Sequence, residues 1–127
     1  QDQKALLYLY RPSELRKDLK DQLAEALLAD AGYPDKGSEQ CVAYLARRFR
    51  SGGEFPHEVG LFLSYPPQDV LGFIENRAVN YKCAGLWKVY GDVEQAQRLF
   101  AKYRKCTDIY CELWRAGSGI GQLAVAV

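Results

Sequence analysis

His57 is the only histidine in the chain, and it is the first residue to consider for acid–base catalysis or metal binding. It lies between Phe55-Pro56 and Glu58, at the start of a bulky apolar segment with the pattern of a strand. Neighbouring residues on a strand point to opposite faces, so His57 and Glu58 would not form a catalytic pair there. The pattern therefore favours a structural histidine. The alternative is an axial ligand to haem or one ligand of a metal site.

The four cysteines, Cys41, Cys83, Cys106 and Cys111, form no Cys-x-x-Cys pair. This usage is typical of reduced thiols in the cytoplasm rather than of a secreted disulfide framework. Cys106 and Cys111 fall in a helical pattern, where five residues correspond to roughly 140° around the axis, so they would not share one metal ion. Cys83 lies in a polar segment and is expected to be the most accessible thiol. A metal site would thus have only His57 and Cys83 as candidates.

Large aromatic residues are concentrated around the two later predicted strands and their connections: Tyr65, Phe73, Tyr81, Trp87 and Tyr90. A tyrosine-rich core would explain this concentration. The alternative is a pocket or a partner-binding surface, because aromatic side chains with a polar atom suit sites where one end stays in water. On that interpretation, the ligand- or partner-binding residues are His57, Glu58, Tyr65, Trp87, Lys88 and Tyr90.

A basic stripe on the last predicted helix, Arg98, Lys102 and Lys105, is the one feature that could hold phosphates. The formal net charge of the chain is only +1, so composition does not favour nucleic acid as a partner. Asp108 and Glu112 follow within one or two turns and can pair with these cations. An ordinary solvated helix face is therefore the favoured interpretation.

Three short segments have the composition of strands: Ala5–Arg11, Glu58–Tyr65 and Leu86–Tyr90. The second is a continuous apolar run, which is typical of a strand covered on both faces. Apolar residues at steps of three and four predict four helices, over 13–32, 38–49, 67–76 and 92–116. The apolar stripe of the last helix runs from Ala96 to Trp114, so we expect this helix to organise the core.

This order of elements favours an α/β fold, with α+β as the alternative, in which about four helices pack on a short three-stranded sheet. The chain has 127 residues, 48% of them hydrophobic, which predicts a single compact domain over 1–127 and excludes disordered and collagen-like classes. It contains no long apolar run and no secretory signal pattern, so we expect a cytoplasmic protein without a membrane span. It also contains no Met, and strand-like residues begin at Ala5, so we expect a native N-terminal segment to be missing.

Two segments carry a family resemblance: Phe55–Asn76, FPHEVGLFLSYPPQDVLGFIEN, and Gly85–Asp92, GLWKVYGD. The matching motifs are Phe55–Gly60, Tyr65-Pro66, Asp69-Val70, Gly72–Ile74 and Trp87–Tyr90, followed on the last helix by Phe100, Tyr103 and Cys106. Together they resemble an uncharacterised bacterial family, a domain of unknown function of anaerobic Firmicutes and related gut bacteria. The resemblance runs from Leu7 to Leu123.

The resemblance implies no specific activity and no defined cofactor. The genes near its members, for flavodoxin-like and iron-uptake proteins, imply a link to iron or redox metabolism. The family pattern also includes an earlier segment with a cysteine and a glycine-rich stretch, which does not precede Ala5 here. We therefore expect a non-catalytic binding or accessory protein that takes a protein partner or a small-molecule ligand. The alternative is a metal- or haem-dependent redox protein or enzyme that uses His57.

Overall fold

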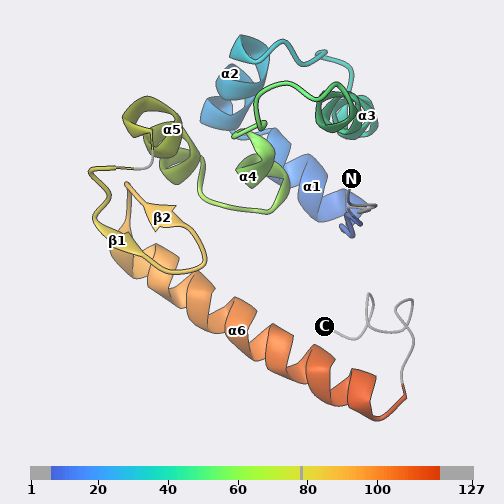
Figure 1. Ribbon diagram of the computed structural model, residues 1–127, viewed down its shortest axis with the longest axis vertical. Coiled ribbons are helices and arrows are strands. Elements are labelled where there is room, and N and C mark those ends of the chain that lie inside the picture. The colour runs from blue at the N-terminus through green and yellow to red at the C-terminus, as the bar shows by residue number, and fades with distance from the viewer. Residues whose placement is uncertain (1–6, 78, 118–127) are drawn as a thin grey trace. The chain divides into compact units, whose positions relative to one another are not determined.

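The computed structural model describes residues 7–77 and 79–117, and these form a mostly helical protein (Figure 1). The helices are α1 (Pro12–Leu19), α2 (Gln22–Asp30), α3 (Ser38–Arg50), α4 (Val59–Phe62), α5 (Pro67–Asn76) and α6 (Val93–Arg115), and the strands are β1 (Cys83–Ala84) and β2 (Lys88–Val89). The expected three-stranded sheet of an α/β or α+β fold is wrong, because the described residues contain only one antiparallel pair of two-residue strands beside six helices.

The chain separates into two compact units. One unit is Arg11–Val93, and the described part of the other is 7–10 together with 94–117. No helix in these parts has both the length and the apolar character needed to cross a membrane. The expectation that residues 1–127 form one domain stays a prediction.

The predicted strand Glu58–Tyr65 is a short helix followed by a turn. Val59–Phe62 forms α4, and Ser64 takes a positive φ of 63°. A short apolar run fits a buried strand and a buried helical turn equally well, so periodicity alone does not separate the two. Of the other predicted strands, 7–11 carries no strand, residues 5 and 6 lie outside the described residues, and Leu86–Tyr90 contains only β2.

The predicted helix over 13–32 is two helices, because the chain starts a new one at Asp21. The Asp21 carboxylate accepts a hydrogen bond from the backbone N–H of Ala24 at 3.1 Å, which caps α2. Lys20 ends α1 directly before it. Asp21 has the residue type that favours an N-cap, but the continuous leucine pattern on either side concealed this signal.

The core of the unit Arg11–Val93 lies where α1 packs against α2, α3 and α4, and where α5 packs against α2, α4 and β2 (Figure 1). Its buried apolar side chains include Leu15, Leu19, Ala24, Leu27, Leu28, Leu45, Leu61, Phe62, Val70 and Val89. Each fully buried aliphatic side chain stabilises the fold by about 1.5–3 kcal/mol relative to exposure. Leu61 and Phe62 are thus core residues, as the apolar run indicated, although they belong to a helix.

The helix α5 follows the sequence prediction closely. It begins at Pro67, whose fixed φ suits the first turn, and it ends where Arg77 takes the left-handed conformation with φ 48°. Asp69 lies in its first turn and Val70 is buried. The helix thereby presents one side to the core and its last turn to the surface.

The helix α6 also has nearly the predicted bounds, but its apolar stripe is less buried than expected. Only Ala96 and Phe100 are buried, at 0% and 6% exposure, whereas Trp114 is 58% exposed. The expectation that the whole stripe from Ala96 to Trp114 organises the core is therefore wrong for its C-terminal half.

Candidate functional site

Asp69 is a buried carboxylate that binds the hairpin to α5. It is 2% exposed. Its Oδ2 accepts a hydrogen bond from the indole N–H of Trp87 at 2.7 Å, and its Oδ1 accepts from the backbone N–H groups of Tyr90 and Gly91, both at 2.8 Å. Hydrogen bonds to a charged acceptor are the strong ones, and here they satisfy three donors of the hairpin with one side chain. Asp69 therefore fixes the end of the hairpin on the first turn of α5.

Two glycines permit this close approach. A Cβ at Gly72 would lie 2.2 Å from Cγ and 2.3 Å from Cβ of Tyr90, and one at Gly91 would lie 2.7 Å from Oε1 of Gln68. Real side chains do not approach so closely, so Tyr90 packs against α5 only because position 72 has no side chain.

Tyr65 completes this region by stacking on Trp87, with ring centroids 4.4 Å apart and an interplanar angle of 26°. A Cβ at Gly60 would lie 2.8 Å from Cδ2 of Tyr65, so α4 also approaches this ring closely. Burial raises the pKa of the Tyr65 hydroxyl. We call the set Tyr65, Asp69, Gly72, Trp87, Tyr90 and Gly91 the Asp69 cluster. Three predicted ligand- or partner-binding residues lie in it: the indole N–H of Trp87 and the backbone N–H of Tyr90 bind Asp69, and Tyr65 stacks on Trp87. The buried hydroxyl of Tyr90 has no hydrogen-bond partner among the described residues.

Glu58, another predicted site residue, points into the protein and is 5% exposed. Its Oε2 accepts a hydrogen bond from the Tyr33 hydroxyl at 2.8 Å and lies 2.6 Å from Nε of Arg48. Burial, and then the hydrogen bond to Glu58, raises the pKa of Tyr33 above its usual value. Glu58 thus joins α3 to the segment before α4. Glu58 points into the protein whereas His57 is exposed, so the two side chains do not lie together. The cause is the ion pair of Glu58 with Arg48, and not the alternation of side chains on a strand.

His57 lies on an exposed aromatic surface. The centroid of its ring is 5.2 Å from that of Phe73 on α5 and 5.9 Å from that of Phe55. Phe55 is 57% exposed and Ile74 39% exposed. We call Phe55, His57, Phe73 and Ile74 the His57 patch. It combines large apolar groups with one imidazole.

A surface hollow of about 310 Å³ opens within this patch. Its described lining is Glu54, His57, Phe73, Ile74 and Arg77. Oε1 of Glu54 lies 3.8 Å from Nε2 of His57, while Arg77 lies at the C-terminal end of α5. The hollow therefore has an apolar and aromatic floor, with one acidic and one basic side chain beside it.

The sixth predicted site residue, Lys88, lies on β2 and places its Nζ 4.9 Å from the centroid of the Tyr81 ring. This cation–π contact holds the lysine against the hairpin. Lys88 does not line the hollow beside His57 in the part of the chain that the structure describes.

The metal candidates do not come together with further ligands. Cys83 lies half-buried in β1 whereas Cys111 is exposed, so the expectation that Cys83 is the most accessible thiol is wrong. Oε1 of Glu54 lies 3.8 Å from Nε2 of His57. Within 7–77 and 79–117, no three His, Cys, Asp or Glu side chains are grouped so that they could hold a metal ion. These residues therefore provide at most isolated ligands.

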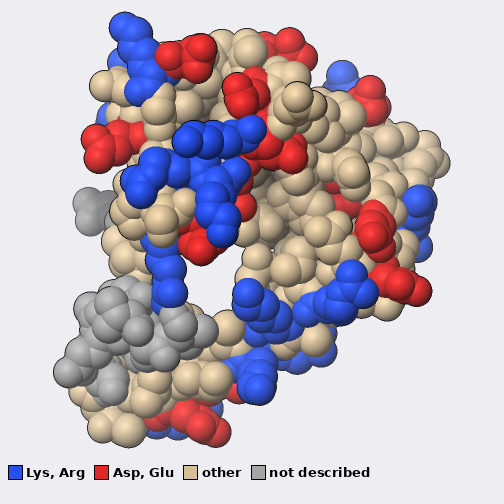
Figure 2. Space-filling view, turned by 180° about the vertical axis from the view of Figure 1, so that it is seen from behind, with Lys and Arg blue, Asp and Glu red and all other residues tan. Residues whose placement is uncertain are grey.

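The stripe Arg98, Lys102 and Lys105 is exposed along α6, as expected for a solvated helix face. On the face seen in Figure 2, Lys and Arg side chains lie interspersed with Asp and Glu. The formal net charge of the whole chain is only +1, which does not favour nucleic acid as the partner of this stripe.

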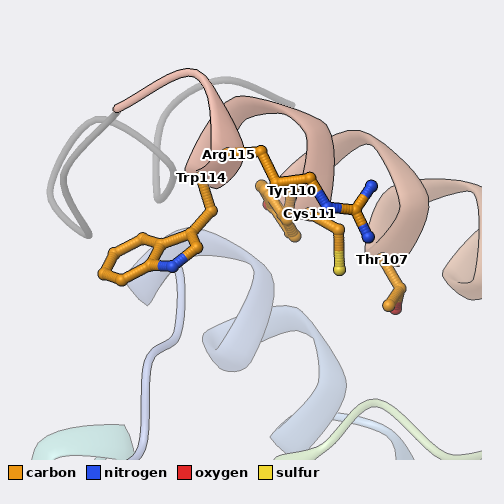
Figure 3. Close-up of a pocket in the computed structure, with 5 residues that line it drawn as sticks. All are labelled: Thr107, Tyr110, Cys111, Trp114 and Arg115. Carbon is orange, nitrogen blue, oxygen red and sulfur yellow. The ribbon is translucent and has the colours of Figure 1, made fainter.

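A second hollow, of about 430 Å³, follows the last turns of α6 (Figure 3). Its described lining is Thr107, Tyr110, Cys111, Trp114 and Arg115. Trp114 was expected in the core but is 58% exposed, and the sequence predicted no role for Cys111 and Arg115. Cys111 and Arg115 are four residues apart, and this spacing does indicate that they share one face of the helix.

The role of Asp69 was missed because its partners are 18 to 22 residues away along the chain. The residue in the sequence that could have indicated this role is Trp87, because a buried indole N–H needs a hydrogen-bond acceptor. Glu54, Ile74 and Arg77 of the hollow carried no comparable signal.

Two comparisons, with curated proteins and with solved structures, give no significant match. A family model does match, over residues 1–124, which is nearly the whole chain. The motifs collected in the Asp69 cluster and the His57 patch lie within this range. The chain belongs to the family described as "Protein of unknown function (DUF3793)".

Proposed function

We propose that this chain is a non-catalytic binding protein that docks a partner protein through the His57 patch. The observation that carries the proposal is the exposure of Phe55, which is 57% exposed although its ring contacts both Phe49 and His57. Clustered exposed aromatic groups are typical of protein interfaces, where they supply large contact areas at low entropic cost.

The contrast with Glu58 and Asp69 supports this choice of surface. Their carboxylates are taken up by internal hydrogen bonds, so they contribute to folding rather than to a ligand. His57 instead has a side chain that is 39% exposed, beside an apolar hollow. Among the six predicted ligand- or partner-binding residues, it is the one on which the proposal rests. A ligand role for the other five stays a prediction, as do a cytoplasmic location and a link to iron or redox metabolism.

Site-specific photocrosslinking in the native cells tests the proposal. A photoreactive phenylalanine replaces Phe55 or, separately, Ile74, and the matched control replaces Leu86, which is 55% exposed on the hairpin. We expect one partner to be crosslinked from both patch positions and not from position 86. The Phe55→Ala variant should then bind the purified partner about tenfold more weakly or worse, because it loses a large buried aromatic contact.

Two outcomes would contradict the proposal. The first is crosslinking from position 86 with the same yield, or no crosslinked protein from positions 55 and 74. The second is a stoichiometric metal or chromophore in the protein purified from native cells that is lost in His57→Ala. That result would favour the redox alternative instead.

A further inference from the structure

The hollow in the His57 patch has side chains of opposite charge that do not pair with each other. Glu54 and Arg77 both line it. The carboxylate of Glu54 is directed to His57 at 3.8 Å, and no ion pair joins it to Arg77 among the described residues. A bound peptide could lie in the hollow in either of two chain directions. Because one acidic and one basic side chain line the hollow, the two directions would give different charge contacts.

From this arrangement we infer that the docked segment of the partner protein carries a large apolar side chain flanked by a basic residue on one side and an acidic residue on the other. The apolar side chain would enter the hollow between His57, Phe73 and Ile74. The basic residue would face Glu54, and the acidic residue would face Arg77. This inference rests on the proposed docking function and adds the chemistry of the partner.

A protein segment fits better than a small metabolite because the apolar surface continues beyond the hollow. Phe55 lies outside the described lining, and its ring contacts those of both His57 and Phe49. A volume of about 310 Å³ is close to the lower end for small-molecule sites. It accommodates one or two side chains of a segment whose remaining part covers Phe55.

The charges add direction rather than most of the affinity. Exposed ion pairs each contribute little, so correct charge order should strengthen binding about fivefold over the reversed order. Reversed order also places the acidic residue of the segment near Glu54 and its basic residue near Arg77. Charge order is therefore the property to measure.

The test uses two blocked peptides of the same composition, Lys-Leu-Phe-Glu and Glu-Phe-Leu-Lys, and a neutral one, Gln-Leu-Phe-Gln. Each is titrated to millimolar concentration into the isotopically labelled full chain, and NMR shift changes report both the affinity and the place of binding. We expect one charged order to bind about fivefold more tightly than the other. Its shift changes should centre on His57, Phe73 and Ile74.

A double charge reversal, Glu54→Lys with Arg77→Glu, makes the test specific because it leaves the net charge unchanged. It should invert the preferred peptide order. The matched control is Glu39→Lys with Arg50→Glu, two exposed residues of α3 outside the described lining of the hollow. This control should keep the original order.

The failures of the two proposals can be told apart. Equal binding of all three peptides at the patch, or an order preference that survives the double reversal, overturns the charge inference and leaves the docking surface in place. Absence of shift changes at the patch with every peptide overturns the inference too. In that case the photocrosslinks from positions 55 and 74 decide the docking function separately.

Discussion

The Asp69 cluster and the His57 patch both include residues of α5 and of the motifs that carry the family resemblance. In the cluster the central side chains are buried, and in the patch most side chains are exposed to solvent. In the cluster, Asp69 and Trp87 are 2% and 8% exposed, and their polar atoms are bonded to each other. In the patch, Phe55 and Ile74 remain exposed. One short stretch of chain thus supplies both a buried hydrogen-bonded cluster that holds the fold together and an exposed apolar surface.

The largest effect is expected from Asp69→Ala, which would leave the donors of Trp87, Tyr90 and Gly91 without their acceptor. An unsatisfied buried donor costs about 1–3 kcal/mol, so the free energy of unfolding should fall by about 3–5 kcal/mol. Urea unfolding followed by Trp fluorescence measures this loss. The control Asp35→Ala removes an exposed carboxylate and should change stability by less than about 0.5 kcal/mol. Equal losses of stability in Asp69→Ala and Asp35→Ala would show that the buried carboxylate of Asp69 contributes no more to folding than an exposed one.

A smaller loss is expected from Gly72→Ala. In most helices this change stabilises by up to about 1 kcal/mol, but here the new methyl group would overlap the Tyr90 ring, whose Cγ lies 2.2 Å from the ideal Cβ position. We expect destabilisation by about 2–3 kcal/mol, measured by thermal unfolding. Gly53→Ala is the matched control, because nothing lies within 4 Å of its Cβ position. A stabilising Gly72→Ala would show that Tyr90 does not pack on α5.

Local signals explain which elements could be predicted. Pro67 and Asp69 define the start of α5 from neighbouring residues alone, and the helix begins where they indicate. The segment 58–65 lacked such a signal, because its apolar run suits a strand and a helical turn alike. Gly60 departs from a strand composition, and its close approach to Tyr65 explains why a glycine is needed there.

The sites were less predictable because they are assembled across the sequence. Asp69 meets Trp87, and Glu58 meets Arg48 and Tyr33, through contacts that no spacing rule encodes. His57 was identified because it is unique, not because its surroundings could be foreseen. Its neighbours Phe73, within α5, and Arg77, at the C-terminal end of α5, are 16 and 20 residues away along the chain, and only folding places them beside it.

A loss of about 1 kcal/mol is expected from Tyr33→Phe, which removes the hydrogen bond to Glu58. The pH dependence of the free energy of unfolding gives a second test of this hydrogen bond. Because the pKa of Tyr33 is raised in the folded state, folding holds the hydroxyl proton more tightly than the unfolded chain does. This contribution is complete below pH 10, the usual tyrosine pKa, and is lost as the pH rises above it.

Stability measured from pH 8 to pH 11 should therefore fall more steeply in the wild type than in Tyr33→Phe. The control Tyr44→Phe changes a tyrosine whose ring contacts Tyr33 at 4.5 Å. It should keep the steep alkaline dependence. Parallel curves for the wild type and Tyr33→Phe would contradict the role assigned to the Tyr33–Glu58 hydrogen bond.

The smallest effect on stability is expected from His57→Ala, because the imidazole is 39% exposed and Glu54, which lies 3.8 Å from it, is itself 81% exposed. We expect a change of less than about 0.5 kcal/mol in urea unfolding, although partner binding through the patch should weaken. The two measurements must be made on the same variant, since a patch residue affects binding without affecting folding. A loss of stability as large as that of Asp69→Ala would instead place His57 with the inward residues. The His57 side chain would then not be available on the surface for binding a partner.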